Sequence, residues 1–214
     1  MKTINGGGGV NRKTVIERLS RHGGGRAKAG GRRAGRGDHS LNPGMRPAAS
    51  PVPAAVLVPL VDRADGLTVL LTRRADHLHD HAGQISFPGG RVEPHDIDVR
   101  AAALRETREE IGLPEERVEI VGRLDDYVTR TGYLVTPLVG VIAPPYPTDP
   151  DPVEVADVFE VPLAFILDPV NHERHSRRWE GAERFFYVLP FEDRYIWGAT
   201  AGMLVNLYEV LRES

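Results

Sequence analysis

The chain has 214 residues and is 41% hydrophobic, which suits one packed domain or one domain with a tail, so we expect no second large domain. It contains no cysteine, which excludes disulfides, thiolate metal sites and cysteine nucleophiles, so any metal must bind to oxygen or imidazole. The net charge of −3 is unevenly divided, because residues 1–50 carry 11 of the 27 basic groups and only 2 of the 30 acidic groups.

The first 46 residues predict a basic Gly/Arg-rich tail that is mostly disordered. Only residues 10–22 show helical spacing of apolar side chains, and residues 23–45 offer too little apolar surface to offset the entropy of ordering. Such a basic segment could contact RNA phosphates, but it has no aromatic side chain on which a base could stack. We therefore favour a linker and tail over a nucleic-acid arm, and place the folded domain at residues 47–214.

The domain alternates short strands with helices. The pattern predicts a hairpin at 55–61 and 67–72, a helix at 98–113, strands at 118–124, 134–142 and 155–163, a second hairpin at 175–180 and 184–190, and a final helix at 199–213. This order indicates a mixed α/β domain with helices packed on a curved sheet. We expect Trp197 and the apolar helix after it to belong to the core.

No apolar run approaches the ~18 residues needed to span a bilayer, and the N-terminus has no signal-peptide hydrophobic region. We therefore expect a cytoplasmic protein without membrane contact. A homodimer is compatible with the sequence.

The helix at 98–113 carries the most informative pattern. Glu106, Glu109 and Glu110 lie at i, i+3 and i+4, so their carboxylates share one face within a single turn. A hard cation such as Mg²⁺ or Mn²⁺ would relieve the repulsion among them, because it prefers carboxylate and water oxygens. Arg105 lies four residues before Glu109 and can orient it through a helical ion pair.

An acidic triplet alone is also common on solvated helices. The preceding bend changes that interpretation, because Gly89 and Gly90 would let backbone amides approach phosphate oxygens just before the helix. Loop and helix together favour a site for a diphosphate.

Residues 90–113 resemble the signature of the Nudix family. Gly90, Arg105, Glu106, Glu109 and Glu110 occupy signature positions, as do Gly112 and Leu113. The sequence departs from the signature in having Asp96 for the first glutamate, one extra residue before Arg105, and Thr107 for an apolar residue. The resemblance implies an α/β/α sandwich with a curved mixed sheet and metal ligation by Glu106, Glu109 and Glu110.

Residues 70–91 resemble the upstream motif of the coenzyme A pyrophosphatase branch, which also has an aspartate and the extra residue. Arg74, Gly83 and the run from Phe87 to Gly90 match, whereas Ala75 and His79 replace a serine and an arginine. The resemblance implies cleavage of coenzyme A or its acyl forms to 4′-phosphopantetheine, or its acyl form, and adenosine 3′,5′-bisphosphate.

Site residues are expected in two groups. The catalytic set is Glu106, Glu109, Arg105 and Glu154, in which the general base stays undetermined among the three glutamates. The set expected to contact substrate, through guanidinium, imidazole, aromatic or backbone groups, is Arg74, His79, His81, Gly83, Phe87, Gly89, Gly90 and Arg91.

Two alternatives stay open at this point. One is a hydrolase of the same family acting on ADP-ribose, a dinucleoside polyphosphate or an oxidised nucleoside triphosphate. The other is a non-catalytic module that binds a nucleotide or RNA. The four intact residues Arg105, Glu106, Glu109 and Glu110 argue against the second, since binding alone does not need them all.

Overall fold

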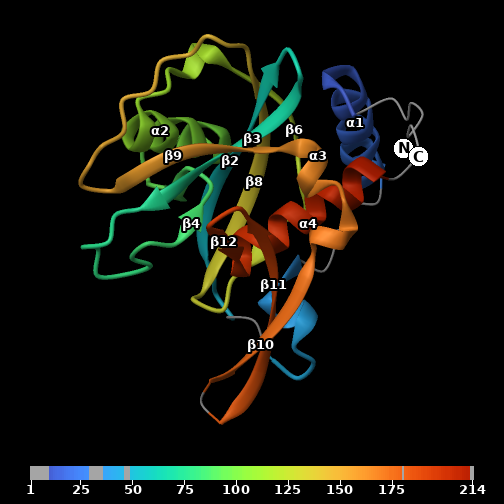
Figure 1. Cartoon of the computed structure of the whole chain (residues 1–214), viewed down its shortest axis with the longest axis vertical. Coiled ribbons are helices and arrows are strands. Elements are labelled where there is room, and N and C mark those ends of the chain that lie inside the picture. The colour runs from blue at the N-terminus through green and yellow to red at the C-terminus, as the bar shows by residue number, and fades with distance from the viewer. Residues whose placement is uncertain (1–9, 29–35, 46–48, 180, 213–214) are drawn as a thin grey trace, which may run out of the picture.

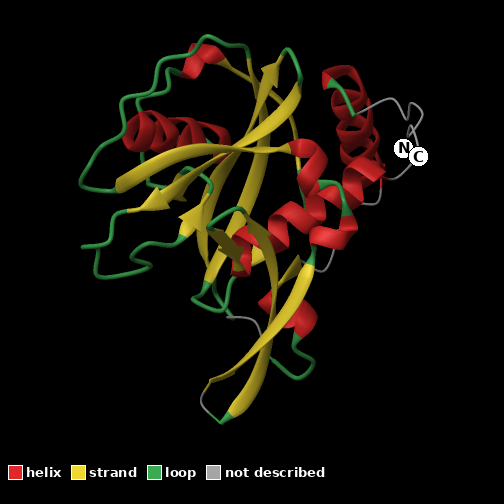
Figure 2. Ribbon diagram, in the orientation of Figure 1, coloured by secondary structure: helices red, strands yellow, loops and turns green. Residues whose placement is uncertain are grey.

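The structure is a computed structural model that describes residues 10–28, 36–45, 49–179 and 181–212 (Figure 1). A large mixed sheet lies between helix α2 (Val99–Ile111) on one face and helices α1 (Arg12–Lys28) and α4 (Gly198–Arg212) on the other (Figure 2). This arrangement is the expected α/β/α sandwich with a mixed sheet.

The large sheet has nine strands in which β2 and β8 form the central parallel pair. The path runs β1–β7–β8–β2–β3–β4, while β5 pairs with β2, β6 with β8 and β9 with β3. The strands are β1 (Arg36–Gly37), β2 (Val52–Arg63), β3 (Gly66–Arg74), β4 (Ile85–Ser86), β5 (Gly89–Arg91), β6 (Val118–Arg123), β7 (Tyr127–Val128), β8 (Tyr133–Ile142) and β9 (Val155–Pro162). The predicted first hairpin is confirmed as the antiparallel β2–β3 pair.

Strand β2 shows why helices cover both faces of this sheet. Side chains alternate between the faces, and both sets are apolar. Leu57 and Val61 belong to the core cluster beneath α2, whereas Val58 and Leu60 belong to the cluster beneath α4. All four are fully buried, so removing either helix layer would expose a hydrophobic face.

Helix α2 begins and ends where its sequence predicts. The Asp98 carboxylate accepts a hydrogen bond from the Ala101 amide at 2.8 Å, which caps the N-terminus. Gly112 ends the helix in the left-handed conformation at φ 66°. Thr107, which replaces an apolar residue of the family signature, is buried and donates its hydroxyl to the Ala103 carbonyl at 2.7 Å.

A second, antiparallel sheet extends from the main body. It comprises β10 (Glu173–Trp179), β11 (Ala182–Phe191) and β12 (Arg194–Trp197), so the predicted second hairpin is confirmed and a third strand joins it. Gly181 lies in the hairpin turn with φ 79°. The short helices are η1 (Asp38–Leu41), η2 (Glu115–Arg117), α3 (Leu163–Ile166) and η3 (Pro169–Asn171).

The predicted final helix is confirmed as α4, which is almost entirely buried and lies across the large sheet. No helix within the described ranges is long and apolar enough to cross a membrane.

The N-terminal segment differs from the expected tail and linker wherever the structure describes it. Helix α1 runs beyond residue 22, and Val15 and Leu19 are buried against the domain. Residues 36–45 also contact the domain, since the Arg36 Nε donates to Asp125 at 3.2 Å and Asn42 bonds to the Phe185 backbone. Contacts with distant segments of the chain therefore offset the entropy cost of ordering these residues, which their own apolar surface could not offset. Residues 1–9, 29–35 and 46–48 of the expected tail and the domain start lie outside the described ranges.

This packing predicts that α1 contributes to the stability of the domain. Leu19 is 1% exposed and lies against Gly122 of β6. We expect Leu19→Ala to lower the free energy of unfolding by about 2–5 kcal/mol through lost burial and a residual cavity. Urea unfolding measures this change. Lys13→Ala, on the exposed side of α1, should change it little, and equal stability of Leu19→Ala and wild type would contradict the packing.

A partly buried carboxylate, that of Glu160, ties β9 to β2 and β3. Arg63 donates two hydrogen bonds to Glu160, at 3.1 and 2.5 Å, Thr68 donates a third at 2.5 Å, and the Tyr146 hydroxyl donates a fourth. Burial opposes ionisation of Glu160, but these donors outweigh it and lower its pKa to about 2.

The lowered pKa predicts an acid-dependent loss of stability. The contribution of ionised Glu160 is fully present above its ordinary pKa of 4.5 and is lost as the pH falls toward about 2. The unfolding free energy of wild type should therefore fall more steeply across this window than that of Glu160→Gln. Denaturant titrations at several pH values test this, and parallel profiles would contradict it.

Candidate active site

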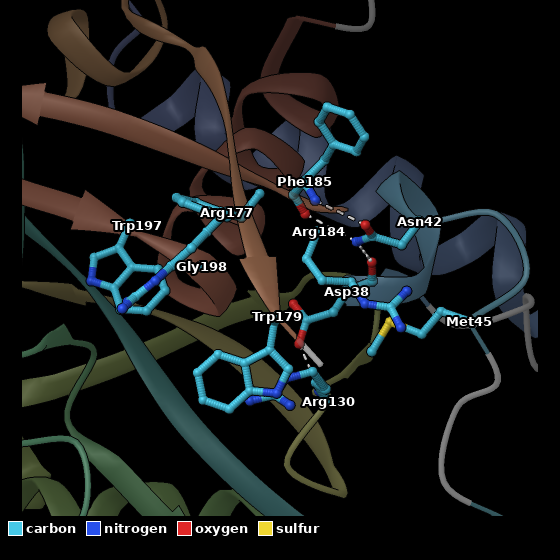
Figure 3. A pocket seen from close by; sticks show the side chains of 11 residues that line it. Asp38, Asn42, Met45, Arg130, Arg177, Trp179, Arg184, Phe185, Trp197 and Gly198 are labelled. Carbon is cyan, nitrogen blue, oxygen red and sulfur yellow. Dashed lines mark hydrogen bonds between the residues drawn. The ribbon is translucent and has the colours of Figure 1, made fainter. Parts of the chain in front are cut away.

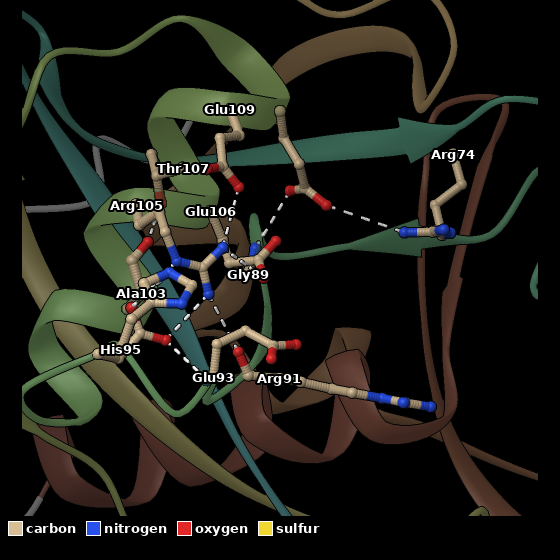
Figure 4. Close-up of polar contacts among 12 residues, drawn as sticks. Arg74, Gly89, Arg91, Glu93, His95, Ala103, Arg105, Glu106, Thr107 and Glu109 are labelled. Atoms are coloured by element: carbon tan, nitrogen blue, oxygen red, sulfur yellow. Dashed lines mark hydrogen bonds and ion pairs between the residues drawn. The ribbon is translucent and has the colours of Figure 1, made fainter.

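Helix α2 and strand β5 bring the acidic residues and the glycine bend together (Figure 4). Glu110 is the most buried of the three acids, at 4% exposed. Its carboxylate accepts a hydrogen bond from the Gly89 amide at 3.1 Å, and Arg74 Nη1 lies 3.8 Å from its other oxygen. Burial raises the pKa of Glu110 to about 8, and the nearby Glu106 adds to the rise.

Glu106 lies one turn earlier and is packed against the glycine bend. A Cβ added to Gly90 would lie 2.5 Å from the Glu106 carboxylate, so only glycine at this position permits the observed approach. Burial raises the pKa of Glu106, although Arg105 opposes that rise.

Arg105 connects the helix to the preceding loop. Its guanidinium donates to both oxygens of Asp96 at 3.0 Å, to Glu106 at 3.1 Å, to Glu109 at 2.9 Å and to the Arg91 carbonyl at 3.3 Å. The expected helical pair of Arg105 with Glu109 is present. The pairing with Asp96, which lies nine residues away, had no periodic signal in the sequence.

Asp96 is the buried counterion of this network, since its side chain is 3% exposed. The bidentate bond from Arg105 lowers the pKa of Asp96 to about 2, against the opposing effect of burial. Asp96 therefore stays ionised and fixes the Arg105 guanidinium, while a second bond from the Glu93 amide at 2.7 Å holds the loop.

The three glutamates are not equivalent in this arrangement. Glu109 is half exposed and held by Arg105, whereas Glu106 and Glu110 point toward the bend. Across the described ranges, no three His, Asp or Glu side chains are grouped so that they could hold a metal ion as they stand. Arg105 engages one carboxylate oxygen of Glu106 and one of Glu109, so ligation by all three glutamates would use the other oxygens and a rearrangement of the side chains.

The chemistry of the donors fits a hard divalent cation at Glu106 and Glu110. Both are carboxylates with raised pKa values, and Glu110 has one amide donor and a distant guanidinium to balance its charge. A buried carboxylate with so few donors is one that a cation would keep ionised.

The glycine bend differs in detail from the expected phosphate-binding amides. Gly89 has φ 147°, and a Cβ there would lie 2.4 Å from the Ala55 carbonyl of β2, so this glycine permits strand pairing. Its amide already donates to Glu110. Gly89 therefore allows β2 to pack close to β5, and Gly90 allows Glu106 to do the same. This packing role goes beyond the role expected for the two glycines.

The guanidinium groups of the two expected substrate-binding arginines lie in different surroundings. Arg74, at the end of β3, faces Glu110, and its Nε is buried with no hydrogen-bond partner among the described residues. Arg91 is exposed on β5, where its guanidinium contacts the Tyr133 hydroxyl at 2.7 Å. Tyr133 was not predicted, because the contact spans 42 residues of sequence.

The remaining expected substrate residues are more dispersed. His79 and His81 are exposed on the loop after β3, and His81 pairs with Gln84 at 2.9 Å. Gly83 forms a turn with φ 68°. Phe87 is 2% exposed and its side chain packs in the core cluster beneath α4, whereas its contact with substrate stays a prediction.

Glu154 lies in the loop before β9, close enough to raise the pKa values of Glu106 and Glu110. Its carbonyl accepts the Ala75 amide at 2.8 Å, which fixes the loop against the end of β3. The side chain is exposed, so its carboxylate can approach a ligand bound at the acids.

The close contact between Gly90 and Glu106 predicts that adding one methyl group at residue 90 weakens metal binding without disrupting the fold. Gly90→Ala should displace the Glu106 carboxylate and weaken Mn²⁺ binding about tenfold, as expected for a change in what positions a ligand. Isothermal titration calorimetry measures the affinity, and circular dichroism checks the fold. Gly23→Ala, where an added Cβ meets nothing within 4 Å, is the matched control. Unchanged affinity in Gly90→Ala would remove Glu106 from the metal site.

Comparison with known proteins identifies the family of the chain. Residues 51–188 match the family model described as the NUDIX domain. The chain is 40% identical over 154 residues to "Uncharacterized Nudix hydrolase NudL" of Yersinia pestis, an alignment that covers 72% of this chain and 77% of that protein.

Solved structures show partial likeness. An Ap4A hydrolase binary complex from C. elegans aligns with TM-score 0.46 and 23% identity, covering 52% of this chain and 80% of that one. The NUDIX domain of Shewanella oneidensis NrtR, complexed with ADP ribose, aligns with TM-score 0.43 and 19% identity, covering 61% and 84%. On the extent of the domain match and the identity to NudL, the chain belongs to the Nudix hydrolase family.

Proposed function

We propose that this protein is a metal-dependent pyrophosphohydrolase that cleaves the diphosphate of coenzyme A or its acyl derivatives. The observation that carries the proposal is that Glu106 and the buried Glu110 lie against the β5 bend. Arg74 faces the Glu110 carboxylate at the same place. Acidic groups for a cation and a guanidinium for phosphate thus meet at one place.

In this proposal Glu106, Glu109 and Glu110 hold Mg²⁺ or Mn²⁺. Bound there, the cation would neutralise the diphosphate and lower the pKa of a water. Arg74 and Arg91 contribute positive charge for the phosphates, while Arg105 and Asp96 keep the helix and loop in register. Positioning and charge stabilisation then account for most of the rate enhancement, as in other phosphoryl transfers.

The general base is proposed among three carboxylates. Glu106 and Glu109 lie on α2, and Glu154 approaches from the loop before β9. Glu154 is exposed and has no part in the Arg105 network, so it is free to accept a proton from water. Glu109, by contrast, shares one carboxylate oxygen with Arg105.

The substrate assignment rests on the motif at residues 70–91. This segment forms the end of β3, the following loop, β4 and β5, and so borders the acids directly. Within it, the Arg74 guanidinium faces the Glu110 carboxylate. The alternative substrates are ADP-ribose, a dinucleoside polyphosphate and an oxidised nucleoside triphosphate, all of which carry the same reacting diphosphate.

A binding-only module is disfavoured because the Arg105 network and all three glutamates are present.

Incubation with coenzyme A and Mn²⁺ followed by mass spectrometry tests the substrate. Addition of one water across the diphosphate should yield 4′-phosphopantetheine and adenosine 3′,5′-bisphosphate. Coenzyme A left intact while ADP-ribose or a dinucleoside polyphosphate is hydrolysed would overturn the substrate and keep the reaction class.

Two variants test the assignment of the acids. Glu110→Gln should lower turnover by at least about 100-fold with the fold intact, because the carboxylate that faces both the bend and Arg74 loses its charge. Arg108→Gln, which changes an exposed side chain of the same helix, is the matched control. Near-normal turnover in well-folded Glu110→Gln would remove Glu110 from the site.

A further inference from the structure

A pocket of about 160 Å³ lies between the small sheet and the segment at residues 38–45 (Figure 3). We call it the tryptophan pocket, defined by Arg130, Arg177, Trp179, Arg184, Phe186 and Trp197. None of these residues belongs to the site on α2 and β5.

The aromatic side chains come from one face of the small sheet. Phe186 lies two residues after Arg184 on β11, and Trp179 lies two residues after Arg177 on β10, so each pair shares that face. Trp197 on β12 meets Phe186 edge to face at 5.4 Å between ring centroids. This places large aromatic surfaces in a pocket that is open to solvent, although Trp197 was expected in the core.

The arginines make the same pocket strongly basic. Arg177 and Arg184 are direct cross-strand partners, a placement in which like charges repel. Arg130 reaches the pocket from the β7–β8 loop, with its guanidinium 4.5 Å from the Trp179 ring centroid. Among the described residues, neither Arg177 nor Arg184 has a carboxylate within ion-pairing distance.

The acidic residue of the pocket does not balance these charges. Asp38 accepts hydrogen bonds from the Tyr127 hydroxyl at 2.8 Å and from the Arg130 amide at 2.6 Å, so its oxygens are already engaged. Three arginines therefore face one occupied carboxylate, and the pocket attracts anions.

The remaining wall is held in place by backbone contacts. Asn42 is buried, accepts the Phe185 amide at 2.9 Å and donates to the Phe185 carbonyl at 3.0 Å. The same side chain amide also donates to the Asp38 carbonyl at 2.6 Å. These bonds fix the segment at 38–45 against β11, so the pocket exists without a ligand.

We propose that the tryptophan pocket binds a small ligand in which an aromatic ring is joined to a phosphate, of the nucleoside monophosphate class. Trp179, Trp197 and Phe186 offer stacking surfaces for the ring. Arg177 and Arg184 form a pair whose mutual repulsion a phosphate relieves. This site is separate from the hydrolytic site and goes beyond the proposed function.

Intrinsic fluorescence tests the proposal directly, because the only two tryptophans of the chain both line this pocket. Full-length protein in EDTA, which prevents metal-dependent turnover, is titrated with AMP, adenosine and inorganic phosphate. AMP should change the tryptophan emission saturably and bind at least tenfold more tightly than adenosine or phosphate alone. No saturable change with AMP would overturn the proposal.

Variants locate the bound ligand. Arg177→Gln and Arg184→Gln should each weaken AMP binding at least tenfold, with unchanged circular dichroism. Arg178→Gln is the matched control, because it lies on the same strand but on the opposite face. If Arg178→Gln weakened AMP binding equally, general surface charge would explain the effect and the proposal would be overturned. Glu110→Gln should bind AMP normally even when hydrolysis is lost, and loss of binding in that variant would assign the signal to the hydrolytic site instead.

Discussion

The site depends on the hydrogen bonds that one guanidinium makes. Arg105 joins α2 to the loop before it, through Asp96 and the Arg91 carbonyl, and at the same time orients Glu106 and Glu109. A planar group with five donors can serve all four acceptors at once, whereas an ammonium group could not. Asp96 is buried and ionised, so its carboxylate fixes the position of the Arg105 guanidinium. The helix cannot shift along its axis without breaking these hydrogen bonds.

The second constraint is the absence of side chains at the bend. Gly89 lets β5 approach the backbone of β2, and Gly90 lets the Glu106 carboxylate approach β5. Glu110 is buried beside the same bend, where the Gly89 amide donates to its carboxylate and the Arg74 guanidinium lies 3.8 Å away. A carboxylate in this environment favours a cation as its partner, so close packing and the proposed chemistry have one physical origin.

The two proposed sites use charge in opposite ways. On α2, acidic groups with raised pKa values favour a cation. In the tryptophan pocket, arginines held opposite one another favour an anion. The body of the chain is acidic overall, so the basic pocket stands out from its surroundings, and its Arg130 loop lies next to Tyr133, which contacts Arg91 of the hydrolytic site.

Local pattern was sufficient for features that lie within one element. The boundaries of α2 followed from Asp98 and Gly112, and the common face of the three glutamates followed from helical periodicity. The β2–β3 hairpin and the hairpin at Gly181 followed in the same way, because strand alternation and turn residues act over a few positions.

The sequence by itself therefore determined the acidic helix, the glycine bend and the mixed α/β class. Only the tertiary structure decided which glutamate is buried, that Asp96 pairs with Arg105, that Phe87 lies in the core, and that α1 and Asn42 pack on the domain. These features are contacts between segments far apart in the chain, and their free energy depends on sheet order and burial. No local periodicity encodes that order, so the neighbours of a side chain across the sheet are fixed only when the chain folds.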